Sequence, residues 1–214
     1  SLFGINVEGQ LITLNEFFAT NHNFFLDVLC GLFYINWIPV PLAFGVWLYF
    51  KNKQQFLYFS LAFLLVNLIG FSIYYIHPAA PPWYVAKYGF DIHLGTQGEV
   101  AGLSRFDELI GIKIFGLIYS RNSNVFAALP SLHCAYPVVV LFYALKNNTL
   151  IMKFLFSLFM IGIWFSAIYS GHHYVTDVIL GVFCAALGLV IFQMILIKSD
   201  WFQKFITKYL QLIN

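Results

Sequence analysis

Tyr169-Ser-Gly-His172-His173-Tyr-Val-Thr-Asp177 joins two long apolar runs near the C-terminal end of this 214-residue chain. His173 and Asp177 are four positions apart, so on a helix that begins here they lie on one face, one turn from each other. The carboxylate can therefore orient the imidazole. A second histidine ends the segment Pro130-Ser-Leu-His133, again where a polar loop meets an apolar run. Two histidines and one aspartate on one side of a bilayer would form a reaction centre.

The composition places the chain in a membrane. It is 61% hydrophobic and only 9% charged, with a mean hydropathy of +0.80, whereas ordinary soluble domains carry about 25% charged residues. The net charge of +2 and the absence of a dense Lys/Arg cluster give no support for a nucleic-acid partner. The three cysteines form neither a disulfide framework nor a CxxC metal pattern. We expect no metal and no cofactor.

Apolar runs divide the chain into membrane spans. The predicted spans cover residues 28–50, 56–76, 130–145, 154–170 and 178–197. Pro39 and Pro41 should bend the first span, and Pro137 the third. A re-entrant first segment is the alternative to a bent span. The sequence thus predicts an all-α polytopic bundle of about five to six transmembrane helices, forming a single integral-membrane catalytic domain over residues 1–214.

The remaining segments are predicted to lie at the membrane surface. Apolar residues at helical spacing within 1–23 indicate a short interfacial helix, although a disordered N-terminus fits the same pattern. The connection 77–128 holds many of the charged residues and is too polar to span. Within it, Leu103 to Ile118 has mixed helical periodicity and predicts a surface helix over the bundle. The tail after Lys198 reads as an interfacial amphipathic helix.

Lysines predict the orientation of the bundle. Five spans place the connections alternately on two sides. The lysines of one side are Lys51, Lys53, Lys146, Lys153, Lys198, Lys204 and Lys208. By the positive-inside rule this side is cytoplasmic. Both histidine segments and the 77–128 connection then lie on the extracytoplasmic side, in a periplasm or an organelle lumen.

A lone histidine at a membrane interface is often only a polar helix cap. Here His133 and His173 open two helices on one face, and His133 follows Pro-Ser in a helix-start pattern whose free N–H groups suit phosphate oxygens. His172 projects about 100° away from His173 around a helix. We therefore place His172 beside the centre rather than in it, together with Tyr136.

These residues carry a family resemblance. Pro130-Ser-Leu-His133 and His173-Tyr-Val-Thr-Asp177 resemble the second and third signature motifs of the type 2 phosphatidic acid phosphatase superfamily. The similarity is closest to its inositol phosphorylceramide synthase branch. The motifs that point to this branch are Ala80-Pro-Pro-Trp-Tyr84, Gly102-Leu-Ser-Arg-Phe-Asp107, Pro130-Ser-Leu-His-Cys-Ala-Tyr-Pro137 and the doubled histidine. They cover residues 77 to 181, about half of the chain.

The departures from the superfamily pattern concern its phosphate clamp. His77-Pro78 stands where the superfamily has Arg-Pro, Gly70 where it has a lysine, and Ser166-Ala167 where it has Ser-Arg. Another cation must then neutralise the phosphoryl charge. The candidates on the predicted side are Arg105, Arg121 and Lys87. Ser131 and His77 complete the predicted phosphate-binding set.

The resemblance implies a phosphohistidine mechanism. His173 attacks a phosphodiester phosphorus, Asp177 holds its ring, and His133 protonates the departing alcohol and later deprotonates the acceptor. Transfer of a phosphoinositol-type headgroup from a glycerophospholipid to a ceramide-like acceptor is the implied reaction. Hydrolysis of a lipid phosphate or diphosphate by water is the alternative within the superfamily. A proton-relaying transporter would place charges at mid-membrane, and a vanadium haloperoxidase would be soluble and keep the clamp, so both fit the sequence less well.

Overall fold

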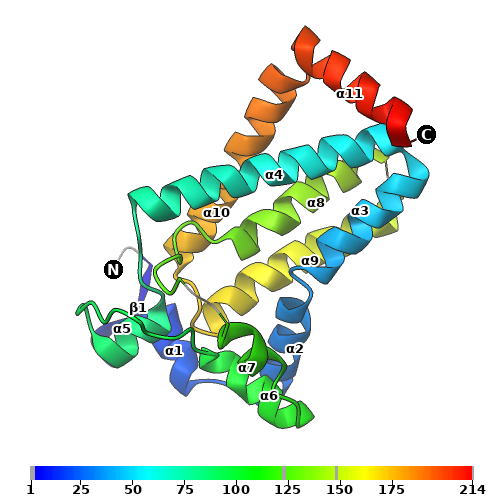
Figure 1. Ribbon diagram of the computed structural model, residues 1–214. Helices are drawn as coiled ribbons and strands as arrows, with labels where there is room; N and C mark the ends of the chain where they lie inside the picture. The colour runs from blue at the N-terminus through cyan, green and yellow to red at the C-terminus, as the bar shows by residue number, and fades with distance from the viewer. Residues whose placement is uncertain (1–2, 122–123, 148, 214) are drawn as a thin grey trace.

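The computed structural model describes residues 3–121, 124–147 and 149–213 (Figure 1). Asn122 and Ser123, within the predicted 77–128 connection, lie outside the described residues, as do the ends of the predicted 1–214 domain. The elements in chain order are β1 (Gly4–Val7), β2 (Gln10–Thr13), α1 (Leu14–Thr20), α2 (Phe24–Ile35), α3 (Pro39–Lys51), α4 (Lys53–Ile76), α5 (Pro82–Tyr88), the 3₁₀ turn η1 (Ala101–Leu103), α6 (Ser104–Ile110), α7 (Ile114–Tyr119), α8 (Leu132–Asn147), α9 (Leu150–Tyr169), α10 (Val175–Ile191), the π-helical turn η2 (Phe192–Leu196) and α11 (Asp200–Ile213).

The helical prediction is confirmed for the bundle, but the N-terminal segment begins with a β-hairpin that the periodicity did not predict. β1 and β2 pair antiparallel with Val7 opposite Gln10. The two residues between them, Glu8 and Gly9, have φ of 51° and 87°, and two left-handed residues make the tight turn that suits a hairpin. Helix α1 follows, because Thr13 and Glu16 form a reciprocal capping box.

The long helices match the predicted spans closely. α4, α9 and the continuous segment Val175–Leu196 are each long and apolar enough to cross a membrane. The pair α2 and α3 passes the same test together, with a bend of 42° between them. Pro39 at the first turn of α3 explains the bend, since proline starts a helix well but cannot continue one. The chain is an integral membrane protein.

The predicted third span, residues 130–145, corresponds to α8, which is shorter than α4, α9 and the continuous segment Val175–Leu196. This helix has 16 residues, which rise about 24 Å, less than the roughly 30 Å of a hydrocarbon core. α8 is the central helix, because it packs against α3, α4, α9 and α10, and many of its side chains are fully buried. A helix that begins inside the protein need not reach the membrane surface.

The two histidine segments lie at the same end of the bundle. There the hydroxyl of Tyr74, near the end of α4, donates to the carbonyl of Pro130 at 2.9 Å, and the amide of Ser131 donates to the carbonyl of Asp177 at 2.9 Å. Gly181 on α10 lies so close to α8 that an added Cβ would sit 2.3 Å from the carbonyl oxygen of Ser131. The first turns of α8 and α10 are therefore locked together.

The 77–128 connection folds over this end as short helices (Figure 1). The single predicted helix from Leu103 to Ile118 is broken at Gly111, which has φ of 71°. The side chain of Asp107 stabilises the start of the next helix, α7, by accepting hydrogen bonds from the amides of Phe115 and Gly116 at 3.1 and 2.8 Å. The break lets the connection turn back toward the bundle.

At the other end, α11 packs across the bundle as the predicted amphipathic tail. Phe202 and Ile206 on one of its faces are buried, whereas Trp201 on another is 65% exposed. The carbonyl of Ile213 accepts a hydrogen bond from the ammonium of Lys53 at the start of α4. The lysines of the predicted cytoplasmic side thus lie at the end opposite to the histidines.

Candidate active site

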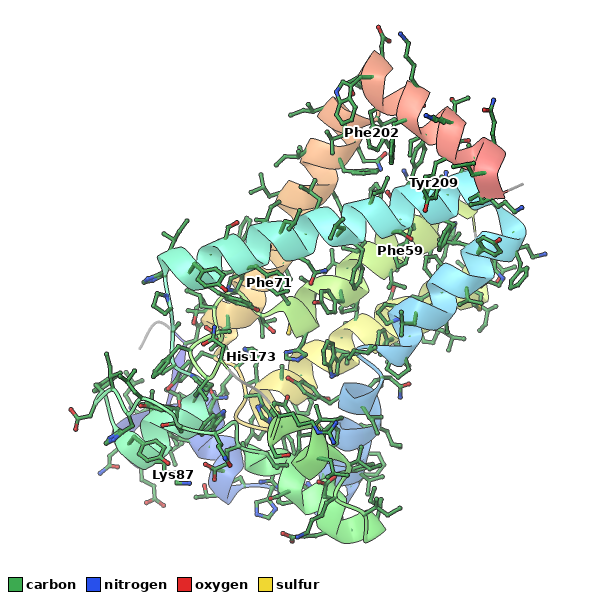
Figure 2. The ribbon with its side chains drawn as sticks, in the orientation of Figure 1. Phe59, Phe71, Lys87, His173, Phe202 and Tyr209 are labelled. Atoms are coloured by element: carbon green, nitrogen blue, oxygen red, sulfur yellow. The ribbon has the colours of Figure 1, made fainter. Side chains whose placement is uncertain are left out.

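His133 and His173 are in direct contact. Nδ1 of His133 lies 3.1 Å from Nε2 of His173. His133 is the second residue of α8, and His173 stands in the turn before α10, so the interlocked helix starts determine their separation. Figure 2 shows His173 near the centre of the view, beside the region where α4, α8 and α10 approach one another. His173 is 5% exposed.

The tautomer of His173 is set mainly by a backbone carbonyl. Its Nδ1–H donates to the carbonyl of Ala128 at 3.1 Å, whereas the nearest oxygen of Asp177 is 3.6 Å away. The carboxylate of Asp177 instead accepts from the amide of Tyr174 at 2.8 Å and caps α10. With Nδ1 protonated, Nε2 keeps its lone pair and accepts from His133. Asp177 is close enough to stabilise positive charge on the ring.

His172 is a neutral, tightly packed ring beside the pair. It stacks on Tyr119 at 4.3 Å and on Tyr34 at 5.7 Å between ring centres, and its Nε2–H donates to the carbonyl of Val100 at 2.9 Å. Burial, with a smaller contribution from the neighbouring His173, lowers the pKa of His172 to about 3. His172 thereby ties the turn that carries His173 to the overlying connection.

Asn15 also holds the turn, although sequence reasoning did not single it out. Its side-chain amide donates to the carbonyls of Ile168 at 2.8 Å and His173 at 3.0 Å. Asn15 is 7% exposed, although it lies on the short α1. A buried amide needs hydrogen-bond partners, but the burial of Asn15 is a property of the folded protein and leaves no signal in the sequence.

A cavity of about 610 Å³ opens beside the two histidines. Its wall is mostly apolar and aromatic, with contributions from α4, α8 and the connection. The lining residues are Trp37, Phe71, Tyr74, Tyr75, Pro81, Trp83, Gly98, Ile118, Tyr119, Arg121, Asn124, Val125, Ala127, Ala128, Leu132, His133, Tyr136, His172 and His173. Such a size and lining suit part of a lipid molecule.

Trp37 and Tyr136 build the apolar wall next to His133. The ring of Trp37 meets that of His133 at 4.4 Å and stacks on Tyr136 at 5.9 Å. The hydroxyl of Tyr136 donates to the side chain of Asn67 on α4 at 2.6 Å. Trp37 lies at the break between α2 and α3, which brings it to the site although the next residue, Ile38, is exposed.

Of the three cations predicted to bind phosphate, one lines the cavity and two do not. Of the described residues that line the cavity, Arg121 is the only Lys or Arg. Nε of Arg105 pairs with Asp27 at 2.6 Å, and the guanidinium lies over the ring of Tyr169. Lys87 pairs with Glu99 at 2.9 Å, and Figure 2 places Lys87 far below His173 at the edge of the molecule.

The two remaining predicted phosphate ligands do not line the cavity. His77 follows the end of α4 and is exposed. Ser131 is fully buried, and its hydroxyl accepts from the amide of Cys134 at 3.3 Å. Ser131 thus serves the first turn of α8. Gly70, where the superfamily has a lysine, packs against Leu132, with an added Cβ only 2.6 Å from that side chain.

A membrane helix bundle with two imidazoles in contact beside a cavity that suits part of a lipid molecule is typical of a membrane-embedded enzyme. The chain belongs to the PAP2 superfamily, because the model of that family matches residues 4–191. The resemblance on the histidine motifs is thereby confirmed.

Its relatives include named synthases. The chain is 54% identical to the phosphoinositol dihydroceramide synthase of Bacteroides thetaiotaomicron over its whole length and covers 71% of that protein. It is 34% identical to the catalytic subunit of inositol phosphorylceramide synthase of Saccharomyces cerevisiae and 33% identical to the inositol phosphorylceramide synthase of Candida albicans. The matches cover 84% and 90% of this chain but 45% and 39% of those proteins. No solved structure matches the chain.

Proposed function

We propose that the chain transfers a phosphoinositol-type headgroup from a glycerophospholipid to a ceramide-like lipid alcohol, as one membrane catalytic domain. The observation that carries this proposal is the 3.1 Å contact between His133 and His173 at an apolar cavity. The 54% identical relative is a protein named phosphoinositol dihydroceramide synthase, and this similarity supports the choice of headgroup and acceptor.

In the first half of the reaction, His173 is the nucleophile. The carbonyl of Ala128 holds the proton on Nδ1, so the lone pair of Nε2 attacks phosphorus. The phosphoryl group displaces the hydrogen bond from His133 as it enters. The bond from phosphorus to the glycerolipid oxygen then breaks, and His133, acting as an imidazolium, gives its Nδ1 proton to that oxygen, which leaves as diacylglycerol while His133 becomes a neutral imidazole.

In the second half, the roles of the two histidines reverse. His133 removes the proton of the acceptor hydroxyl, and the acceptor oxygen attacks phosphorus as the bond to His173 breaks. Asp177, 3.6 Å from Nδ1 of His173, stabilises the positive charge that the ring carries while it is phosphorylated. Both histidines end as they began.

Arg121 is the proposed partner of the phosphoryl oxygens. It lines the cavity that contains both histidines, whereas the carboxylates of Asp27 and Glu99 already bind Arg105 and Lys87. A guanidinium aimed at oxygens that gain charge lowers the barrier most when the site excludes water. Arg105 we assign to fastening the connection to α2.

The acceptor decides between transfer and hydrolysis. Aromatic side chains such as Trp37, Trp83 and Tyr136 line much of the cavity, and such a wall favours a lipid alcohol over water. Hydrolysis of a lipid phosphate remains the second candidate, because the same two histidines perform it when water enters. We further propose that the site faces the extracytoplasmic side, since the lysine-rich connections lie at the opposite end of the bundle.

A product assay tests the proposal. The purified chain in mixed micelles receives a phosphoinositol glycerolipid with and without dihydroceramide, and mass spectrometry resolves the products. We expect a phosphoinositol ceramide and diacylglycerol only when dihydroceramide is present, and neither from a His173→Ala variant that keeps its fold. Release of inositol phosphate or free phosphate at the same rate with and without the acceptor would favour the hydrolase.

A further inference from the structure

The loop between α5 and η1 carries a row of outward apolar side chains. Phe90 is 93% exposed, Ile92 is 74% exposed and Leu94 is 90% exposed. They alternate with Asp91 and His93 in a segment that is not helical. Alternate side chains of an extended segment lie on one side. We name Phe90, Ile92 and Leu94 the loop row.

The buried side chain of Tyr84 holds the backbone of this loop by two hydrogen bonds. The hydroxyl of Tyr84, a side chain only 1% exposed, donates to the carbonyl of Asp91 at 2.9 Å and accepts from the amide of His93 at 2.8 Å. Gly89 and Gly95, with φ of 65° and 81°, turn the chain at the two ends. The backbone is thus fixed from one side while the loop row projects from the other.

The loop row follows closely on a helix that is long and apolar enough to cross a membrane, since α4 ends at Ile76 and α5 begins at Pro82. At the C-terminal end of the spanning helix α4, Tyr75 and Ile76 are 88% and 82% exposed. Figure 1 shows α5 at the same left margin of the molecule as this end of α4. Three large neighbouring apolar side chains directed into water are rare on proteins and mark a contact surface. Because the loop row lies close to the end of a membrane span, the acyl chains of the bilayer are the partner that we expect for it.

We propose that the loop row inserts into the membrane leaflet at the histidine end of the bundle. The polar neighbours fit this orientation, because Lys87 and Glu99 form an ion pair behind the loop. Insertion has a consequence for the site. α5 begins with Pro82 and Trp83, and Trp83 lines the cavity and donates its amide to the carbonyl of Gly171 at 3.2 Å. An anchored loop therefore holds the cavity rim at the level of the lipids, whichever phospholipid the site takes.

The test compares two adjacent positions in the full chain, reconstituted into phosphatidylcholine vesicles. Ile92→Cys and Asp91→Cys are each labelled with a nitroxide, and relaxation by oxygen, which concentrates in bilayers, is compared with relaxation by a water-soluble nickel chelate. The three native cysteines are buried, so the unsubstituted chain serves as the blank. We expect the label at 92 to respond mainly to oxygen and the label at 91 mainly to nickel.

Equal access of nickel to both labels would overturn the proposal, because the loop would then lie in water. Protection of the label at 92 from both reagents would also overturn it, since that result indicates a protein contact. If Ile92→Cys does not fold, Leu94→Cys gives the same test, with the exposed polar Gln97→Cys as its control. None of these residues lines the cavity, so the result is independent of the proposed reaction.

Discussion

Gly181→Ala should separate the two histidines without touching either. The new Cβ would lie 2.3 Å from the carbonyl oxygen of Ser131 and 3.2 Å from its carbonyl carbon. Carbon and oxygen atoms in contact normally stay about 3.3 Å apart, so the first turns of α8 and α10 must separate by about 1 Å. The obstacle is backbone, which cannot rotate out of the way as a side chain would.

The cost follows from the position of this contact. Overpacking of this kind lowers the free energy of unfolding by about 1–3 kcal/mol. The larger effect should be on turnover, because His133 begins α8, His173 precedes α10, and the 3.1 Å between them depends on both helix starts. A misplacement of about 1 Å in reacting groups reduces turnover about 100-fold.

Two other glycines provide matched controls. An added Cβ at Gly188, also on α10, would meet the side chain of Val66 at 2.6 Å, remote from the histidine end of the helix. Gly188→Ala should thus reduce stability but leave the turnover of folded protein nearly intact. Gly45→Ala meets only the ring of Phe59 at 3.4 Å and should change neither. Turnover is measured in proteoliposomes and unfolding by thermal denaturation in detergent. Gly181→Ala with wild-type turnover would refute this explanation of the site geometry.

Four further substitutions, of which Lys87→Gln is a control, test other parts of the site. Arg121→Gln should reduce turnover about 100-fold by removing the cation at the cavity, while Lys87→Gln, which loses only an exposed ion pair, should change it less than about twofold; equal effects would contradict the assignment of Arg121. Asn15→Ala removes two donated hydrogen bonds and should lower kcat more than it changes KM, with a loss of about 1–3 kcal/mol in stability; an unchanged kcat would show that α1 does not position the turn. The pKa of His172 in the folded protein is about 3, below the ordinary 6.5. As the pH falls, His172 therefore binds a proton in the unfolded chain before it does so in the folded protein. The free energy of unfolding should fall by about 2 kcal/mol between pH 6.5 and pH 5. His172→Asn should lose this part of the pH dependence, and an identical pH profile in the variant would show that His172 is not the group responsible.

The sequence predicted the features that depend on local pattern. Runs without charge gave the spans, and the positions of His133 and His173 at the starts of two such runs placed both at one end of the bundle. The motifs Pro130-Ser-Leu-His133 and His173-Tyr-Val-Thr-Asp177 pointed to the superfamily, and the doubled histidine pointed to one of its branches. The bend at Pro39 followed from the geometry of proline alone.

The features that the sequence did not predict depend on tertiary contacts. The acceptor for Nδ1 of His173 is the carbonyl of Ala128, and a backbone carbonyl leaves no mark in a sequence. Arg105 pairs with Asp27, which is 78 positions away in the sequence. The sequence could not predict this pairing, and so it could not show that Arg105 is a weaker candidate than Arg121 for binding phosphate. The sequence could not show that α8 is surrounded by α3, α4, α9 and α10, because apolar residues look alike whether they face lipid or protein.

The most direct test of the proposed mechanism is to trap the intermediate on the chain. Purified protein is mixed with a phosphoinositol glycerolipid and no acceptor, quenched rapidly under alkaline conditions that preserve phosphohistidine, digested and mapped by mass spectrometry. We expect a phosphoinositol adduct on His173 that disappears when dihydroceramide is added and does not form in His173→Ala. An adduct on another residue, or turnover that persists in His173→Ala, would contradict it.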